Sequence, residues 1–172
     1  MTGATTQTAV RPTIQLDSLV SSPASDVVKR MLDLVLTTLA LVALTPLLVI
    51  VACLIKLHDG GPIFFCQRRI GRHGIPFWCY KFRSMVPNAE ALRADLMPQN
   101  VHGENGITFK LKHDPRITPI GRFLRKASID ELPQLFNIIR GEMSLVGPRP
   151  PLPAEVAKYN EQHLQRLSVL PG

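Results

Sequence analysis

The chain has 172 residues, of which 45% are hydrophobic, and a formal net charge of +7. This length allows one domain of ordinary size with an appendage and excludes two full domains, while the apolar content excludes a wholly disordered chain. From Lys56 onward there are 17 Lys and Arg against 10 Asp and Glu, and this difference of +7 favours anionic partners such as phosphates, acidic lipids or nucleic acid.

The N-terminal region divides into a polar tail and an apolar run. Residues 1–28 are rich in Thr, Ser, Ala and Pro and predict a flexible tail. Residues 29–57 contain a stretch of 22 residues without a charge, Leu34–Ile55, with basic residues on both flanks. A helix of that length reaches about 33 Å, enough to cross a bilayer core of about 30 Å. The run therefore predicts a membrane-inserted helix.

Pro46 lies near the middle of this run and leaves two geometries open. One is a spanning helix with a kink, in which the Thr45 hydroxyl satisfies the carbonyl that the proline frees. The other is a re-entrant hairpin that breaks at Pro46 and returns to the same face, which suits basic residues on both flanks. Either geometry puts the basic segment that follows in the cytoplasm.

Residues 58–172 predict a small cytoplasmic domain, mostly α-helical with one β-hairpin. Ile63–Cys66 and Phe77–Phe82 are expected to pair across a polar connector that contains two glycines. Helices are expected over Asn88–Met97, from Thr118-Pro119, from Ser128 to Arg140-Gly141, and over Ala154–Leu167, with a loop at Gln99–Gly106.

Asp130 and Glu131 are the candidate catalytic acids. The plain interpretation of the surrounding Ser128–Pro133 is a helix N-terminus, with Ser128 and Glu131 forming a capping box or Asp130 acting as the cap. The functional interpretation uses the same place. A helix N-terminus favours an ionised carboxylate and attracts phosphate, so one acid could attack phosphorus while its neighbour binds Mg²⁺.

Several basic residues could hold a phosphate-bearing substrate. Lys81 and Arg83 are expected on one face of a strand, although a solvated strand face has the same pattern. Arg125 stands five residues before Asp130 and could lie beside it or point to water. Arg149 lies between prolines that restrict its backbone. Arginine suits phosphate because its planar guanidinium makes paired hydrogen bonds. The five histidines show no metal-ligand spacing.

The motifs, taken in order, resemble those of the monotopic polyprenyl-phosphate phosphoglycosyl transferases, the bacterial sugar transferase family. The resemblance covers residues 29–172. Its marks are Lys29-Arg30 with Asp33, the apolar run interrupted by Pro46, Gly61-Pro62, Gln67-x-Arg69-x-Gly71, Lys81–Met85, Asp114–Thr118, Ser128–Gln134, Gly141–Pro150 and Pro171-Gly172.

This resemblance implies a two-step reaction at the cytoplasmic face of the bacterial inner membrane. Asp130 would attack the sugar-bearing phosphate of a UDP-sugar, release UMP and form a covalent intermediate. A polyprenyl phosphate such as undecaprenyl phosphate would then take the phosphosugar, which initiates exopolysaccharide or glycoconjugate synthesis. Glu131 would bind Mg²⁺. Lys81, Arg83, Arg125 and Arg149 match the family's cations, for which phosphate binding is implied.

The resemblance also implies the re-entrant hairpin and contact with membrane lipid, and it is compatible with a homodimer. The chain departs from the family pattern in two places. Thr45 stands where serine usually precedes the proline, and family members continue past the matching Pro171-Gly172. A C-terminal part of the catalytic domain is therefore expected to be missing. The alternative function is a truncated, inactive, membrane-anchored relative that acts as a partner protein. No nucleic-acid partner is expected, because no helix-turn-helix, RNA-binding or zinc-finger signature accompanies the charge.

Overall fold

The structure is a computed structural model that describes residues 23–96, 111 and 114–172. It confirms the expected combination of helices and one hairpin: the described chain is mostly helical, with a single two-stranded antiparallel sheet and one long apolar N-terminal helix. The first 22 residues of the expected tail and the expected loop at 99–106 lie outside the described residues.

The first described element is one long, unbroken helix, α1 (Pro23–Asp59). It begins inside the segment expected to be tail, with a proline at its first residue, where the missing N–H needs no helical partner. The predicted break at Pro46 is absent, because the helix continues through the proline. The Thr45 hydroxyl donates to the carbonyl of Leu41 at 2.6 Å, whereas the carbonyl that Pro46 leaves free belongs to Val42. By length and composition alone, α1 could cross a membrane.

The hairpin is longer than expected. β1 (Phe64–Ile70) pairs with β2 (Pro76–Phe82), with Phe64 opposite Phe82 and Ile70 opposite Pro76. The first half of the polar segment expected to be a connector, residues 67–70, therefore lies in β1. The turn is tight because His73 and Gly74 both adopt positive φ, 56° and 76°.

The helices that follow are shorter than the sequence predicts. α2 (Ala91–Leu96) is followed, after the gap in the described chain, by α3 (Pro119–Lys126). The Thr118 hydroxyl caps α3 by accepting from the Gly121 N–H at 2.9 Å. The helix predicted from Ser128 is instead a 3₁₀ turn at Ile129–Glu131 followed by α4 (Gln134–Arg140). The predicted C-terminal helix is likewise divided into α5 (Pro153–Val156), α6 (Glu161–Leu164) and a 3₁₀ turn at Gln165–Ser168.

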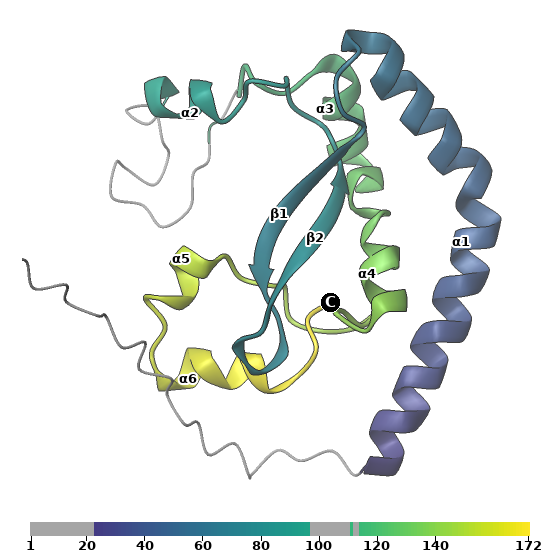
Figure 1. The fold of residues 1–172 in the computed structure, drawn as a ribbon, viewed down its shortest axis with the longest axis vertical. Coiled ribbons are helices and arrows are strands. Elements are labelled where there is room, and N and C mark those ends of the chain that lie inside the picture. Colours follow the sequence, from purple (N-terminus) through teal and green to yellow (C-terminus); the bar gives the residue numbers. More distant parts are fainter. Residues whose placement is uncertain (1–22, 97–110, 112–113) are drawn as a thin grey trace, which may run out of the picture.

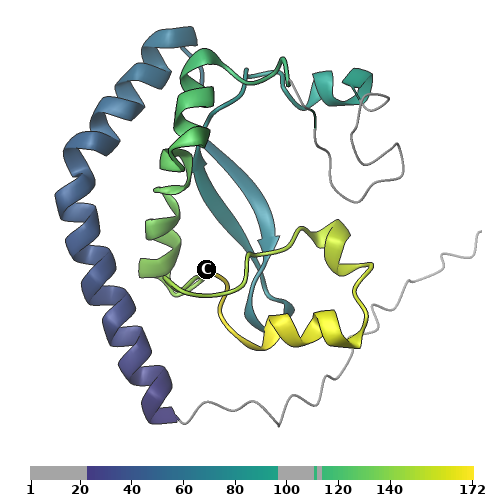
Figure 2. The same cartoon turned by 180° about the vertical axis from the view of Figure 1, so that it is seen from behind.

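Helix α4 lies between the hairpin and α1, and α5 and α6 lie on the other side of the hairpin (Figures 1 and 2). Two small apolar clusters hold these layers together. The first joins α1 to the hairpin and α3 through Val51, Ile55, Phe82 and Leu124. The second joins β2 to α4 and the following loop through Phe77, Cys79, Ile138 and Met143. Helix α1 therefore contributes to the core of the domain that carries the candidate site.

Candidate functional site

Asp130 lies in the 3₁₀ turn between α3 and α4, and its side chain is only 8% exposed. Ser128 enters this turn in the left-handed conformation, with φ of 55°, and its side chain makes no capping hydrogen bond. The predicted capping box and the alternative of Asp130 as a cap are both wrong, since α4 starts after Pro133. The positive φ reverses the chain direction after α3 and directs the acid inward.

Glu131 forms an ion pair with Lys81, the penultimate residue of β2. The Lys81 side chain is largely buried, whereas the Glu131 side chain is half exposed. The pair joins the hairpin to the 3₁₀ turn, so the two adjacent acids differ: one is buried and the other reaches solvent. The buried Asp130 carboxyl is thus suited to act on a bound substrate, and the exposed Glu131 carboxyl is suited to contact a solvated ion.

Arg125 approaches the same turn from the last turn of α3. Its Nε donates to the Ser84 hydroxyl at 2.8 Å, which leaves the two terminal nitrogens without a hydrogen bond to any described residue. This contact depends on a close approach at Gly121, where a Cβ would lie only 1.9 Å from the Ser84 carbonyl oxygen. A glycine is therefore required for α3 to deliver Arg125 to the site.

Burial raises the pKa of the Asp130 carboxyl above its ordinary value. The positive charges of Lys81 and Arg125 oppose that rise in pKa, and the negative charge of Glu131 adds to it. The helix N-terminus expected at Asp130 is absent, because this residue lies in a 3₁₀ turn that precedes α4. The two cations, not a helix dipole, stabilise the charged form. A desolvated carboxylate is also a stronger nucleophile than one surrounded by water.

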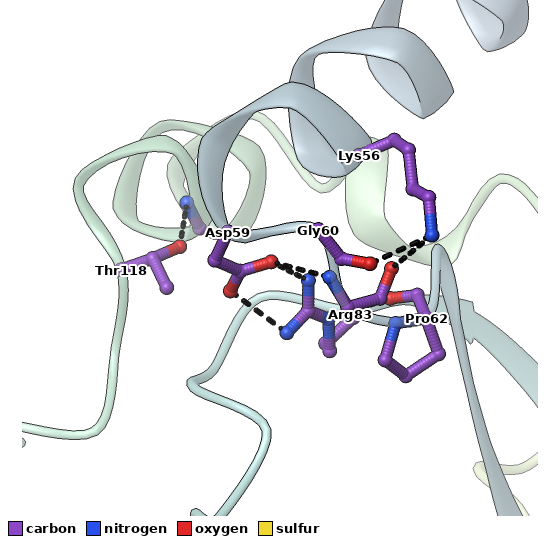
Figure 3. Close-up of polar contacts among 8 residues, drawn as sticks. Lys56, Asp59, Gly60, Pro62, Arg83 and Thr118 are labelled. Atoms are coloured by element: carbon purple, nitrogen blue, oxygen red, sulfur yellow. Dashed lines mark hydrogen bonds and ion pairs between the residues drawn. The ribbon is translucent and has the colours of Figure 1, made fainter.

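Arg83 does not join Lys81 at the acids, although the two were expected on one face. β2 ends at Phe82, and the Arg83 guanidinium forms a two-pronged ion pair with Asp59, the last residue of α1 (Figure 3). Its Nε also donates to the Pro62 carbonyl at 2.6 Å. Gly61 permits this arrangement, since a Cβ there would lie 2.7 Å from an Arg83 nitrogen. In this structure Arg83 fastens the end of α1 to the hairpin.

Arg149 lies in the proline-bounded loop and is exposed. Two contacts attach this loop to β1: the buried Arg69 donates to the Pro150 carbonyl at 2.9 Å, and the Ile70 N–H donates to the Pro151 carbonyl at 3.0 Å. Arg149 itself makes no hydrogen bond or ion pair with a described residue. The Arg149 guanidinium is therefore available to bind a ligand, while the backbone that carries it is held in place by β1.

Asn137, on α4, supports the site and was missed in the sequence. Its side chain is fully buried; it accepts from the Tyr80 N–H at 3.1 Å and donates to the Trp78 carbonyl at 2.7 Å and to Glu142 at 2.6 Å. The Asn137 amide thus hydrogen-bonds the backbone groups of β2 that do not face β1, at Trp78 and at Tyr80, one residue before Lys81. The available signal was a polar residue between Phe136 and Ile138, in the apolar middle of the helix, but nothing in the sequence indicated its partners.

The acids fit the requirements of Mg²⁺. This ion is usually held by one or two carboxylates together with substrate phosphates and water, not by a complete protein cage. Within the described part of the chain there is no cluster of three or more His, Cys, Asp or Glu side chains, whereas Asp130 and Glu131 provide two adjacent carboxyls. Lys81 engages one Glu131 oxygen, which leaves the other available.

Comparison with known proteins agrees with the motifs. The profile of the family described as "Bacterial sugar transferase" matches residues 24–172. The chain is 45% identical to the exopolysaccharide production protein ExoY of Sinorhizobium fredii over 152 residues, which cover 87% of this chain and 67% of that protein. It is 41% identical to the undecaprenyl-phosphate galactose phosphotransferase of Salmonella typhimurium, over 92% of this chain and 34% of that protein.

A third relative, the undecaprenyl-phosphate glucose phosphotransferase of Komagataeibacter xylinus, is 45% identical over 84% of this chain and 26% of its own length. The chain thus spans about two thirds of ExoY and between a quarter and a third of the other two relatives. The family profile matches far more than half of the chain, and the long motifs lie at the site just described. The chain therefore belongs to the bacterial sugar transferase family.

Proposed function

We propose that the chain is a polyprenyl-phosphate phosphoglycosyl transferase that moves a sugar-1-phosphate from a UDP-sugar to undecaprenyl phosphate, and so initiates exopolysaccharide or glycoconjugate synthesis. The observation that carries this proposal is the buried Asp130 carboxyl, on which Lys81 and Arg125 act, in a chain of this family. The names of two relatives, which specify undecaprenyl phosphate and either galactose or glucose, support the acceptor and the class of group transferred.

In the first step a carboxylate oxygen of Asp130 attacks the sugar-bearing phosphorus of the UDP-sugar. A bond forms between this oxygen and phosphorus, the bond from phosphorus to the bridging oxygen breaks, and UMP leaves with the electron pair. Lys81 and Arg125 supply positive charge where the phosphate oxygens gain negative charge. The product on the enzyme is an aspartyl phosphosugar.

In the second step a phosphate oxygen of the polyprenyl phosphate attacks the same phosphorus. The bond to Asp130 breaks, the carboxylate is regenerated, and the lipid carries a diphosphate sugar. Because Asp130 leaves as a carboxylate, the same two cations stabilise the departing group. No proton has to be stored by the protein between the two steps.

Glu131 is the residue that would hold Mg²⁺, through the oxygen that Lys81 does not engage. The ion, when bound, would supply further positive charge to the diphosphate and reduce its repulsion of the attacking carboxylate. Lys81 would then be free to turn from Glu131 to a substrate oxygen.

Contacts at both ends of α1 support its insertion from one side of the membrane. Near its start, Arg30 donates to the carbonyls of Ile138 and Ile139 at 2.7 and 2.9 Å, and Asp33 accepts from the Leu145 N–H at 3.1 Å. At its end, Asp59 pairs with Arg83. A helix held at both ends by one domain does not place its ends on opposite sides of a bilayer.

The outer face of α1 suits burial in lipid, since it exposes twelve large apolar side chains: Val27, Val28, Met31, Leu32, Val35, Leu36, Leu39, Val42, Val49, Ile50, Leu54 and Leu57. We propose that this face enters the cytoplasmic leaflet of the inner membrane while the domain stays on the cytoplasmic side. The basic flanks of α1 agree with this orientation.

Intact-mass spectrometry after exposure to a panel of UDP-sugars tests the chemistry. We expect one donor to add the mass of a sugar phosphate, located on Asp130 by fragmentation, with release of an equal amount of UMP. Asp130→Asn should form no adduct, and Glu161→Gln, which changes an exposed acid on α6, should form as much as the wild type. An adduct on another residue, or none with any donor, contradicts the mechanism and leaves the alternative of an inactive partner protein.

A further inference from the structure

Two arginines line one shallow hollow beside the turn of the hairpin. Arg149, in the proline-bounded loop, and Arg166, in the C-terminal 3₁₀ turn, both border it, together with Tyr159 and Gly71. Neither arginine has a hydrogen bond or ion pair with a described residue, and no Asp or Glu lines the hollow. Two guanidinium groups that border one concavity suit the oxygens of a phosphate-bearing ligand.

Both arginines project from fixed backbone. The Arg149 loop is attached to β1 by Arg69 and Ile70, and the Gly172 N–H donates to the Pro148 carbonyl at 3.0 Å. The turn that carries Arg166 is anchored by the buried Leu167 and by Arg72, whose Nε donates to the Ser168 carbonyl at 3.0 Å. Because little backbone freedom is lost when a ligand arrives, such a site binds more tightly than one on a mobile loop.

The hollow lies near the reacting acids. The face of β2 between them is closed, since Phe77 and Cys79 are buried against α4. Burial raises the pKa of the Cys79 thiol, and the charges of both Glu131 and Arg149 act on that thiol, so both residues lie within electrostatic reach of one side chain. A donor whose diphosphate lies at Asp130 can therefore extend toward Arg149 and the hollow that Arg166 also borders.

A phosphate in this hollow could belong to the nucleotide donor or to the lipid acceptor. The lining favours the donor, because the Tyr159 ring borders the hollow and a nucleotide base can stack on an aromatic ring. A polyprenyl phosphate carries no such base.

We infer that this hollow binds the nucleotide portion of the donor, with Arg149 and Arg166 on its phosphate and the Tyr159 ring beside its base. The inference rests on the proposed function and adds Arg166 and Tyr159 to the donor site. The Tyr159 ring is held by His163, with the ring centroids 5.4 Å apart. After the first step, the same hollow would retain UMP until it dissociates.

Equilibrium binding of UMP, which requires no catalysis, tests this inference. Arg166→Gln should weaken UMP binding about tenfold, as expected for loss of a charge-assisted hydrogen bond, and Arg166→Lys should weaken it less. Arg68→Gln is the matched control, because it removes one charge from the opposite face of β1 and should bind UMP like the wild type. Unchanged melting temperatures would show that each variant is folded.

A second arm separates the two sources of phosphate. Binding to vesicles that contain polyprenyl phosphate should be equal for the wild type and Arg166→Gln. The inference is overturned if Arg166→Gln binds UMP as well as the wild type does, if the wild type binds no UMP, or if only vesicle binding falls. The Asp130 adduct is scored separately, so failure of the covalent mechanism and failure of this hollow give different results.

Discussion

Replacing Asn137 with alanine should unfold the domain at a markedly lower temperature. The change leaves three partly buried polar groups without their partner: the Tyr80 N–H, the Trp78 carbonyl and one Glu142 oxygen. Each such group left without a partner costs about 1–3 kcal/mol, so the two backbone groups alone predict a loss of roughly 4 kcal/mol. For a chain of this size that is a fall in Tm of roughly 10 °C.

Thermal unfolding followed by tryptophan fluorescence is a direct assay, because Trp78 is the single tryptophan of the chain and lies in β2. Asn160→Ala is the matched control. Asn160 caps α6 through one exposed hydrogen bond to the His163 N–H, at 2.9 Å, so its loss should cost about 1 kcal/mol. If Asn137→Ala lowers Tm by no more than Asn160→Ala does, the amide does not hold the edge of β2 and the reasoning is refuted.

Three further changes test other contacts. Gly121→Ala should lower both Tm and adduct formation, because its Cβ would collide with the Ser84 carbonyl and displace α3; normal values for both would contradict the close packing. Thr37→Val should raise Tm by a few degrees, because the fully buried Thr37 hydroxyl has no hydrogen-bond partner among the described residues; a lower Tm would show that it has one. Stability should also fall below about pH 4. The hydrogen bond from Arg116 lowers the pKa of Asp114 in the folded state below its value in the unfolded state. The stability that this bond contributes is therefore fully present above the unfolded-state pKa and is lost as the pH falls through the folded-state pKa. Asp114→Asn should flatten that part of a plot of Tm against pH, and an unchanged slope would refute the assignment.

Local signals in the sequence predicted the starts and ends of several elements correctly. Thr118-Pro119 predicted the start of α3, because a hydroxyl cap and a proline in the first turn both satisfy the helix N-terminus locally. Gly141 predicted the end of α4, and the structure places it in the left-handed conformation, with φ of 83°. Both signals involve groups within a few residues of one another, so they can be read without knowledge of the fold.

Features that depend on distant contacts could not be predicted in this way. The pattern after Ser128 suits a capped helix, but the positive φ of Ser128 and the proline at 133 produce a separate 3₁₀ turn that buries Asp130. Strand alternation placed Lys81 and Arg83 together, yet Arg83 lies past the end of β2, where Asp59 of α1 captures it. The order of motifs identified the acids and the family, but not the environment that raises the pKa of Asp130.

Residues on the two sides of the expected boundary at residue 57 pack against one another. Val51 and Ile55 of α1 are buried against Phe82 and Leu124, so cutting the chain there would expose the core beneath the site. The ion pair between Asp59 and Arg83 also fixes the chain just after β2, two residues from Lys81. Lys81 in turn pairs with Glu131, beside Asp130. A contact chain thus runs from the end of α1 to the reacting acids, and the position of the helix and the geometry of the site are set by the same packing.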